Sequence, residues 1–185
     1  MIKTFDNEKN LSKNLALEIL TKLKNKKQFV LGCPGGRSLK KTYYYLGILS
    51  HKHKISLDKL IIIMMDEYVI KRKNKFFLVN PKVHFSCVRF SKNVIKRLLN
   101  YKKNKKNSLK DYNILFPSVK NPNNYDKIIK SIGGIDIFLL ASGSSDGHVA
   151  FNNIFCKINQ KTHITKLSES TRRDNIKTFS NFKKI

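Results

Sequence analysis

The chain has 185 residues, which suits one domain or one domain with a small extension. Hydrophobic residues make up 41% of it, which is enough for a packed core and excludes an intrinsically disordered protein. The formal net charge is +26, from 38 Lys and Arg against 12 Asp and Glu. Such a charge suits a phosphate-bearing partner, but here it is mostly Lys spread along the whole chain, without an RNA-binding or zinc-finger motif. We interpret it as a compositional bias and do not expect nucleic acid as the partner.

The cysteines and the apolar runs bear on location. Cys33, Cys87 and Cys156 are odd in number and far apart, so they predict neither a disulfide framework nor a metal-ligand pair. Met1 to Asn10 has no apolar segment typical of a secretory signal. The longest apolar run, Leu60 to Met65, is too short to span a bilayer. We therefore expect a cytoplasmic protein with no membrane partner.

The first third of the chain alternates between helix and strand patterns. An amphipathic helix is predicted by apolar residues at every fourth position, namely Leu11, Leu15, Ile19 and Leu23. Phe29 to Cys33 is a short apolar run that predicts a buried strand. Ser38 is placed to cap a helix that runs to about Leu49. Leu60 to Met65 is the clearest strand.

The alternation continues toward the C-terminus. Lys71 to Lys75 is polar and predicts a loop, and Lys102 to Lys110 predicts a solvated linker. Two more helices are marked by apolar residues on one face, first Val94, Ile95, Leu98 and Leu99, then Tyr125, Ile128, Ile129 and Ile132. Gly133-Gly134 ends the second of them. Ile135 to Ala141 predicts a third buried strand, and Thr162 to Leu167 a further one.

This order predicts an α/β fold, a doubly wound and mostly parallel sheet with helices on both faces. In such sheets, ligands bind outside the carboxyl ends of the strands. The unusual residues of this chain gather at those ends, in Pro34 to Ser38, Asp66-Glu67, and Ser142 to Asn153. We therefore expect one site built from these three segments.

The first segment has the chemistry of a phosphate loop. Gly35 and Gly36 let the backbone turn tightly and approach a ligand. The start of the following helix offers unpaired N–H groups, and Arg37 and Ser38 add a charge and a hydroxyl. The spacing matches neither the P-loop nor the dinucleotide fingerprint, so an ordinary strand-to-helix turn stays the alternative.

The other two segments carry groups for proton transfer. Asp66 directly follows a strand and would point into the crevice, where partial burial raises a carboxyl pKa toward that of a useful base. The alternative for Asp66 and Glu67 is a pair at a helix start or on the surface. Asp146 and His148 lie two residues apart in a Gly/Ser-rich loop, and Asp can orient an imidazole that acts as acid or base. A structural histidine is the alternative there.

Three segments carry a family resemblance, and they are Leu31 to Ser38, Met65 to Val69, and Gly133 to Asp136 followed by Asp146 to Asn152. In order and separation they resemble the family of glucosamine-6-phosphate deaminase and 6-phosphogluconolactonase. The Gly-His-Val-Ala-Phe-Asn and Met-Asp-Glu-Tyr segments look like the deaminase branch, whereas the glycine segment fits either branch. A weaker match runs from Thr162 to Arg172.

The resemblance implies a Rossmann-like sugar-phosphate isomerase/deaminase fold that converts glucosamine 6-phosphate to fructose 6-phosphate and ammonia. It implies phosphate binding by Gly35, Gly36, Arg37, Ser38 and Lys177. It makes Asp66 the base that moves a proton between C2 and C1, and His148, oriented by Asp146, the group that assists ring opening. No metal or organic cofactor is implied, because a carboxylate and an imidazole suffice for an aldose–ketose proton shift.

The sequence also departs from the family pattern. Asn153 stands where the deaminases have a Glu, and Lys177 stands where they have an Arg, a better fork for phosphate. Glu67 and Arg172 are secondary candidates for the site. The resemblance also implies that residues 1–185 form a single domain that is incomplete at its C-terminus, through a truncated gene, a partial record or a degenerate relic. A 6-phosphogluconolactonase and a non-catalytic sugar-phosphate binder remain alternatives, and a homo-oligomer remains open.

Overall fold

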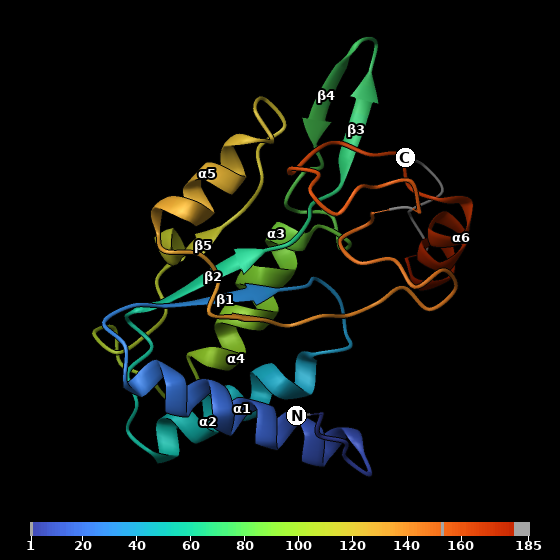
Figure 1. The fold of residues 1–185 in the computed structure, drawn as a ribbon. Helices are drawn as coiled ribbons and strands as arrows, with labels where there is room; N and C mark the ends of the chain where they lie inside the picture. The colour runs from blue at the N-terminus through green and yellow to red at the C-terminus, as the bar shows by residue number, and fades with distance from the viewer. Residues whose placement is uncertain (1, 153, 180–185) are drawn as a thin grey trace.

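The computed structural model describes residues 2–152 and 154–179, and its main sheet has four parallel strands in the order β5-β2-β1-β6 (Figure 1). The central strands are β1 (Phe29–Cys33) and β2 (Leu60–Met64), which pair along their whole length. The outer strands, β5 (Ile114–Leu115) and β6 (Ile137–Phe138), are short. The predicted parallel α/β sheet is confirmed.

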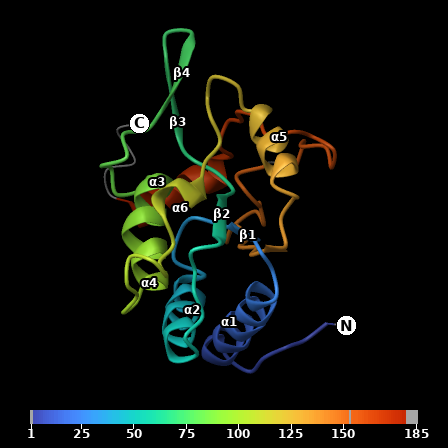
Figure 2. The same ribbon diagram turned by 90° about the vertical axis from the view of Figure 1, so that its left-hand side faces the viewer.

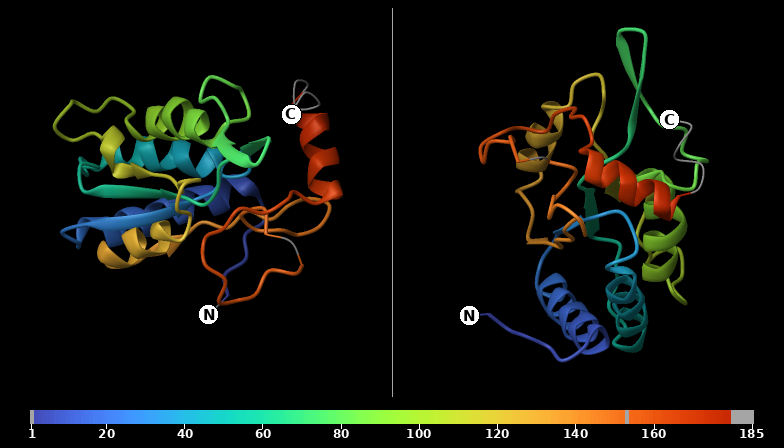
Figure 3. Two further views of the ribbon diagram at one scale, coloured as in Figure 1. Left: turned by 90° about the horizontal axis from the view of Figure 1, so that it is seen from above. Right: turned by 90° about the vertical axis from the view of Figure 1, so that its right-hand side faces the viewer.

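Helices cover both faces of this sheet (Figures 2 and 3). The first face carries α1 (Glu8–Lys24), α2 (Lys40–Lys52), and a continuous run of α3 (Cys87–Phe90), the π-helical segment η1 (Ser91–Lys96) and α4 (Arg97–Leu99). The second face carries α5 (Asn124–Ser131), and a 3₁₀ turn, η2 (Asp111–Asn113), leads into β5. Alternate residues of β1 serve the two faces: Phe29 and Leu31 belong to the larger core with α1 and α2, whereas Val30 packs with Tyr125 of α5.

The last helix, α6 (Glu169–Thr178), lies beyond the carboxyl ends of the strands and covers neither face (Figure 3). Ser168 caps it by accepting a hydrogen bond from the Thr171 backbone N–H. The residues of this helix are mostly polar, and only Thr171 is buried. The helix therefore has no apolar face that could cover the sheet. It lies instead at the carboxyl end of the sheet, and its Ile176 packs against the rim of the main core.

Two predicted helices are confirmed with changes in detail. Helix α1 turns Ser12, Ala16 and Ile19 inward, while Leu11 remains 43% exposed, so its buried face is rotated from the predicted one. Helix α2 begins after Leu39, which makes no side-chain capping bond, so the prediction that Ser38 caps it is wrong. Ser38 is exposed in the turn before the helix.

Two segments predicted as irregular have structure. Lys71 to Lys75 forms the tip of an antiparallel hairpin, β3 (Val69–Arg72) and β4 (Lys75–Leu78), that projects from the molecule (Figure 1). The Lys102 to Lys110 linker is not fully solvated, because Leu109 is buried. The Asn100 side chain bonds both the N–H and the C=O of Leu109, at 2.8 and 3.1 Å.

Two predicted strands differ from the structure. In the Ile135 to Ala141 run only Ile137–Phe138 is a strand, and the run is not buried throughout, since Phe138 is 40% and Leu140 64% exposed. The run is partly exposed because β6 forms an edge of the sheet, where it pairs with β1 and with no other strand of the described residues. Thr162 to Leu167 is extended but pairs with no strand among the described residues.

Candidate active site

The three polar segments meet at one edge of the sheet. β2, β1 and β6 are neighbours and run in the same direction, so their carboxyl ends lie together. These ends lead into Asp66, into the glycine loop (Pro34–Ser38), and into the histidine loop (Ser142–His148). A cavity of about 480 Å³ is lined by residues from all three. The predicted convergence of the three segments is therefore present in the structure.

Asp66 lies at the centre of this edge. Its neighbour Met65 is tied to β1 by a backbone hydrogen bond to Cys33, at 3.1 Å. Asp66 keeps some exposure to the cavity, yet protein atoms closely surround its carboxyl group. Burial raises the Asp66 pKa to about 6, while a hydrogen bond from Cys87 and the charge of His148 oppose the rise. The carboxylate is thus a stronger base than an exposed aspartate.

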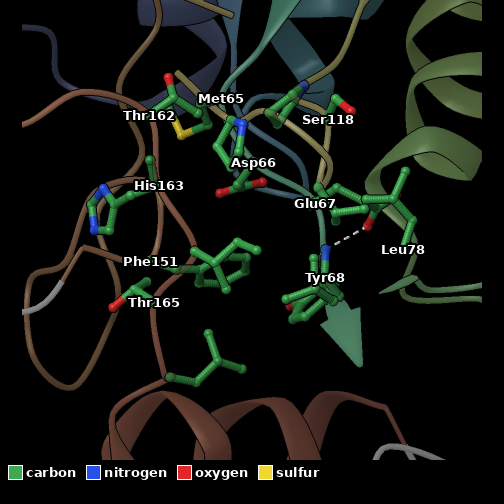
Figure 4. A pocket seen from close by; sticks show the side chains of 17 residues that line it. Met65, Asp66, Glu67, Tyr68, Leu78, Ser118, Phe151, Thr162, His163 and Thr165 are labelled. Atoms are coloured by element: carbon green, nitrogen blue, oxygen red, sulfur yellow. Dashed lines mark hydrogen bonds between the residues drawn. The ribbon is translucent and has the colours of Figure 1, made fainter. Parts of the chain in front are cut away.

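Asp66 also borders a second, smaller pocket of about 110 Å³ (Figure 4). Figure 4 shows its carboxyl group projecting into that pocket, opposite His163 and Phe151. Met65, Tyr68 and Phe151 line both spaces. Asp66 therefore lines two neighbouring hollows at the strand ends.

Glu67 borders the smaller pocket but not the larger cavity, and its carboxylate has a structural role. Its carboxylate accepts hydrogen bonds from the Ser86 hydroxyl at 2.7 Å and from the backbone N–H groups of Cys87 and Val88 at 3.0 and 2.8 Å. It also accepts from the N–H of Tyr68 at 2.8 Å (Figure 4). Glu67 thus accepts hydrogen bonds from the N–H groups at the start of α3, although Asp66 and Glu67 themselves lie between β2 and β3 and do not begin a helix.

His148 is held by a carboxylate that α6 in turn holds. The Asp146 carboxylate lies 2.5 Å from His148 Nδ1. It also accepts hydrogen bonds from the hydroxyls of Ser168, Ser170 and Thr171, at 2.5, 2.6 and 3.1 Å. The hydroxyls of Ser168 and Ser170, followed by the His148 imidazole, hold the pKa of Asp146 below its usual range. Asp146 therefore stays ionised, and its carboxylate contacts the imidazole at Nδ1.

Helix α6 and the histidine loop are joined in both directions. Ser144 and Ser145 of the loop donate hydrogen bonds to the Asp174 carboxylate of α6, at 2.9 and 2.6 Å. These bonds, with Ser145 first, lower the pKa of Asp174. The Thr171 hydroxyl also lies 3.0 Å from His148 Nδ1. The position of His148 thus depends on a helix more than twenty residues further along the chain.

An aromatic contact closes the site beside His148. Phe151 packs against His148 and Tyr68, with ring centroids 5.6 and 4.9 Å apart. Ala150 and Phe151 both have positive φ, 55° and 58°, a conformation that side chains other than glycine rarely adopt. Such backbone strain persists where the surroundings fix it, often at functional sites.

The glycine loop approaches the site closely. Gly36 has φ 88°, which favours glycine. A Cβ on Gly35 would come within 2.8 Å of Cys87 Sγ, so only glycine fits there without movement. Arg37 and Ser38 also line the cavity. The loop thus offers backbone, a guanidinium group and a hydroxyl to a ligand.

Two predicted residues of α6 do not line the cavity. Lys177 is exposed on α6, and Arg172 lies half-buried on the same helix, and neither lines the cavity. The positive charge of Lys177 instead helps to lower the pKa of Asp174. Asn153 lies outside the described residues. A role for these three in ligand binding stays a prediction.

Three residues at the site have no counterpart in the sequence prediction. Cys87 Sγ lies 3.2 Å from Asp66 Oδ1. Asn175 lines the cavity, accepts a hydrogen bond from the Tyr68 hydroxyl at 3.3 Å, and leaves its Nδ2 without a partner among the described residues. Thr171 bridges Asp146 and His148. Cys87 and Asn175 come from segments without a chemical motif, and only the Ser-x-x-Thr capping pattern of α6 hinted at Thr171.

The described part of the chain contains no group of three or more His, Cys, Asp or Glu side chains that could hold a metal ion. Within residues 2–152 and 154–179, no helix has the length and apolar character needed to cross a membrane.

Comparison with known proteins places the chain in a family. No protein-family profile matches it. It is 31% identical over 185 residues to glucosamine-6-phosphate deaminase of Clostridium tetani, covering 97% of this chain and 70% of that protein. Against the enzyme of the same name from Mycoplasma mycoides the identity is 29% over 180 residues, covering 97% and 68%. The fold matches a solved monomeric glucosamine-6-phosphate deaminase of the NagB superfamily with a TM-score of 0.76, at 23% identity, covering 97% and 70%. The chain belongs to the glucosamine-6-phosphate deaminase family.

Proposed function

We propose that the protein converts glucosamine 6-phosphate and water to fructose 6-phosphate and ammonia. The observation that carries this proposal is the meeting of Asp66, the Asp146–His148 pair and the glycine loop at one cavity. The names of the relatives favour the deaminase branch over the lactonase branch. Tyr68, where we expect an Arg in the lactonases, supports the same choice.

The glycine loop is the proposed phosphate site. Gly35 and Gly36 bring the backbone close to the ligand, and Arg37 and Ser38 add charge and a hydroxyl at the cavity wall. Lys177 would join them only if the last turn of α6 moved toward the cavity, because it is now exposed outside it.

His148 is the proposed group for ring opening. It accepts the proton of the O1 hydroxyl of the closed sugar and returns a proton to the ring oxygen as the C1–O5 bond breaks. Asp146 fixes the imidazole for both transfers and stabilises it when it is charged. Thr171, which contacts both groups, holds this pair in place.

Asp66 is the proposed base for the isomerisation. It removes the proton from C2 of the open-chain aldehyde while O1 takes a proton from the ammonium group of the substrate, which gives an enolamine with a C1–C2 double bond. Asp66 then delivers its proton to C1, which leaves a hydroxyl on C1 and an iminium group at C2. Water then adds at C2 and ammonia leaves, which gives the ketose. Burial suits Asp66 to this work, because its pKa of about 6 leaves it ionised at neutral pH and more basic than usual.

The setting of the reaction and the extent of the domain are also proposals. We propose a cytoplasmic enzyme in which residues 1–185 form one domain. The buried, reduced thiols Cys33 and Cys87 support a reducing compartment. One continuous core that joins α1, α2, β1, β2 and the α3–α4 run supports a single domain.

The test is release of ammonia and fructose 6-phosphate from glucosamine 6-phosphate by the wild-type protein, by Asp66→Asn and by Asp111→Asn. Asp66→Asn should lose about 10²- to 10⁴-fold in kcat, because an amide cannot act as the base. Asp111 forms a surface ion pair with Lys96, so its variant controls for the loss of a carboxylate and should act as wild type. No turnover by a folded wild-type protein, or hydrolysis of 6-phosphogluconolactone alone, would overturn the proposal.

A further inference from the structure

The start of α3 is bound to both acidic residues at the strand end. Cys87 is the first residue of α3, and its Sγ lies 3.2 Å from Asp66 Oδ1. Its backbone N–H donates to Glu67 Oε1 at 3.0 Å. Glu67 also accepts from the Ser86 hydroxyl and the Val88 N–H. The thiol therefore stands on a backbone that Glu67 already fixes in place.

The thiol of Cys87 has little room to turn away from Asp66. Cys87 is only 5% exposed. Gly35 lies against it, since a Cβ there would come within 2.8 Å of Sγ. Ser86 caps α3 by accepting a hydrogen bond from the Arg89 N–H at 3.2 Å, which fixes the first turn. The contact between Cys87 Sγ and Asp66 is therefore fixed by packing against the glycine loop and by the capped first turn of α3.

The protonation states of Cys87 and Asp66 decide which group donates the hydrogen bond. Burial, followed by the charges of Asp66 and Glu67, raises the pKa of Cys87 well above its usual value. The group is therefore a thiol at neutral pH and can donate its proton to the carboxylate. A donor at Oδ1 favours the charged form of Asp66, which burial disfavours. Among the described residues nothing bonds Oδ2, which leaves this oxygen for a ligand.

We propose that Cys87 is a positioning residue, whose thiol holds Oδ1 of Asp66 so that Oδ2 faces the substrate and the carboxylate stays ionised near neutral pH. This inference rests on the proposed function in taking Asp66 as the base. The bond itself, however, exists without substrate and can be tested in the unliganded protein. The ionisable groups that face Asp66 from the elements around it are Glu67, Tyr68, Cys87, Tyr125, His148 and, across the smaller pocket, His163.

The test measures the pKa of the Asp66 carboxyl group in unliganded protein, by NMR titration of ¹³C-labelled aspartate, with the resonance assigned by its loss in Asp66→Asn. Cys87→Ala should raise the pKa by about one unit, which is the worth of a hydrogen bond to a charged group. Cys87→Ser keeps a donor and should leave the pKa at or below that of wild type. Cys33→Ala removes another buried thiol, one without a bond to Asp66, and should not change it.

The acidic limb of kcat/KM should follow the titration. With the pKa moved from about 6 to roughly 7, the ionised fraction at pH 6, and with it kcat/KM, should fall roughly fivefold in Cys87→Ala. An unchanged Asp66 pKa in Cys87→Ala overturns the inference. If that variant does not fold, a raised pKa in Cys87→Ser overturns it equally. Absent turnover would refute the proposed function, whereas the titration would still decide the role of Cys87.

Discussion

The Asp66 carboxyl group gains its basicity at the expense of folding free energy. Its pKa rises from 3.8 to about 6, chiefly because burial disfavours the charged form. The folded protein thus binds this proton more tightly than the unfolded chain does. The stabilising contribution is complete below about pH 4 and is lost as the pH rises through 6. At neutral pH the ionised Asp66 carboxylate therefore lowers the free energy of unfolding, because burial disfavours its charge.

Asp66→Asn should consequently stabilise the protein at pH 8 while removing its activity. The gain should not exceed about 3 kcal/mol, the equivalent of two pKa units, and should vanish near pH 4. Thermal unfolding at both pH values measures it. Asp111→Asn is the control of opposite sign, since Lys96 lowers the Asp111 pKa and the variant should lose stability at pH 8. Equal stabilisation by Asp66→Asn at both pH values would contradict the burial argument.

The acidic residues and the histidine of the candidate site could be found in the sequence, while the residues that contact them could not. Asp66 follows an apolar run, and Asp146 and His148 share one loop, so local patterns reveal them. Cys87 reaches Asp66 only after the chain has passed through the β3–β4 hairpin and returned. Thr171 reaches His148 from a different helix. Neither contact leaves a periodic or spaced signal in the sequence.

The run of α3, η1 and α4 depends on the strand end before it. Glu67 accepts the hydrogen bonds of three donors at the start of α3, and those donors are largely cut off from water. The same side chain precedes the hairpin and follows Asp66, so the helix, the hairpin and the base share one anchor.

Glu67→Ala should therefore destabilise the fold by about 2–3 kcal/mol, because several buried donors lose their acceptor. Glu67→Gln keeps one acceptor oxygen and should lose less. Urea unfolding monitored by circular dichroism measures both. Glu18→Ala, on the exposed face of α1, is the matched control and should stay within about 0.5 kcal/mol of wild type. A loss in Glu67→Ala no larger than in the control would rule out the anchor.

The central strands and the helices could be predicted because their buried positions are occupied by apolar residues in a regular pattern. β1 and β2 are continuous apolar runs, and α5 is followed closely by Gly133 and Gly134, both with positive φ. The β3–β4 hairpin could not, because backbone pairing holds it together and its lysines resemble those of a loop. Thr162 to Leu167 has strand-like composition, yet its residues line the smaller pocket and not the sheet.

The high positive charge of the protein makes the choice of ligand testable. A surface with net charge +26 attracts many polyanions, but such binding weakens steeply with salt. A site that combines a glycine loop, a guanidinium group and shaped walls should bind a sugar phosphate with a weaker dependence on salt, because fewer charges are paired.

Fructose 6-phosphate should stabilise the protein against heat, by about 2.7 kcal/mol at one hundred times its Kd. Fructose should give no comparable shift, because it lacks the group that the glycine loop is proposed to hold. Arg37→Gln should weaken the stabilisation by fructose 6-phosphate. Lys130→Gln, at an exposed position of α5, should leave that stabilisation unchanged. Thermal shift measurements at low and high salt compare these cases. Stabilisation by any polyanion, lost in high salt, would show that only net charge is at work.

The exchange of hydrogen bonds between the histidine loop and α6 also sets an order of assembly. Asp66 and the glycine loop leave the ribosome early, within a core of strands and helices that can close around them. His148 emerges later and acquires its fixed orientation only when Ser168, Ser170 and Thr171 reach Asp146. During synthesis the scaffold can therefore fold before the candidate site is complete. The orientation of His148 is fixed only when α6 has been made.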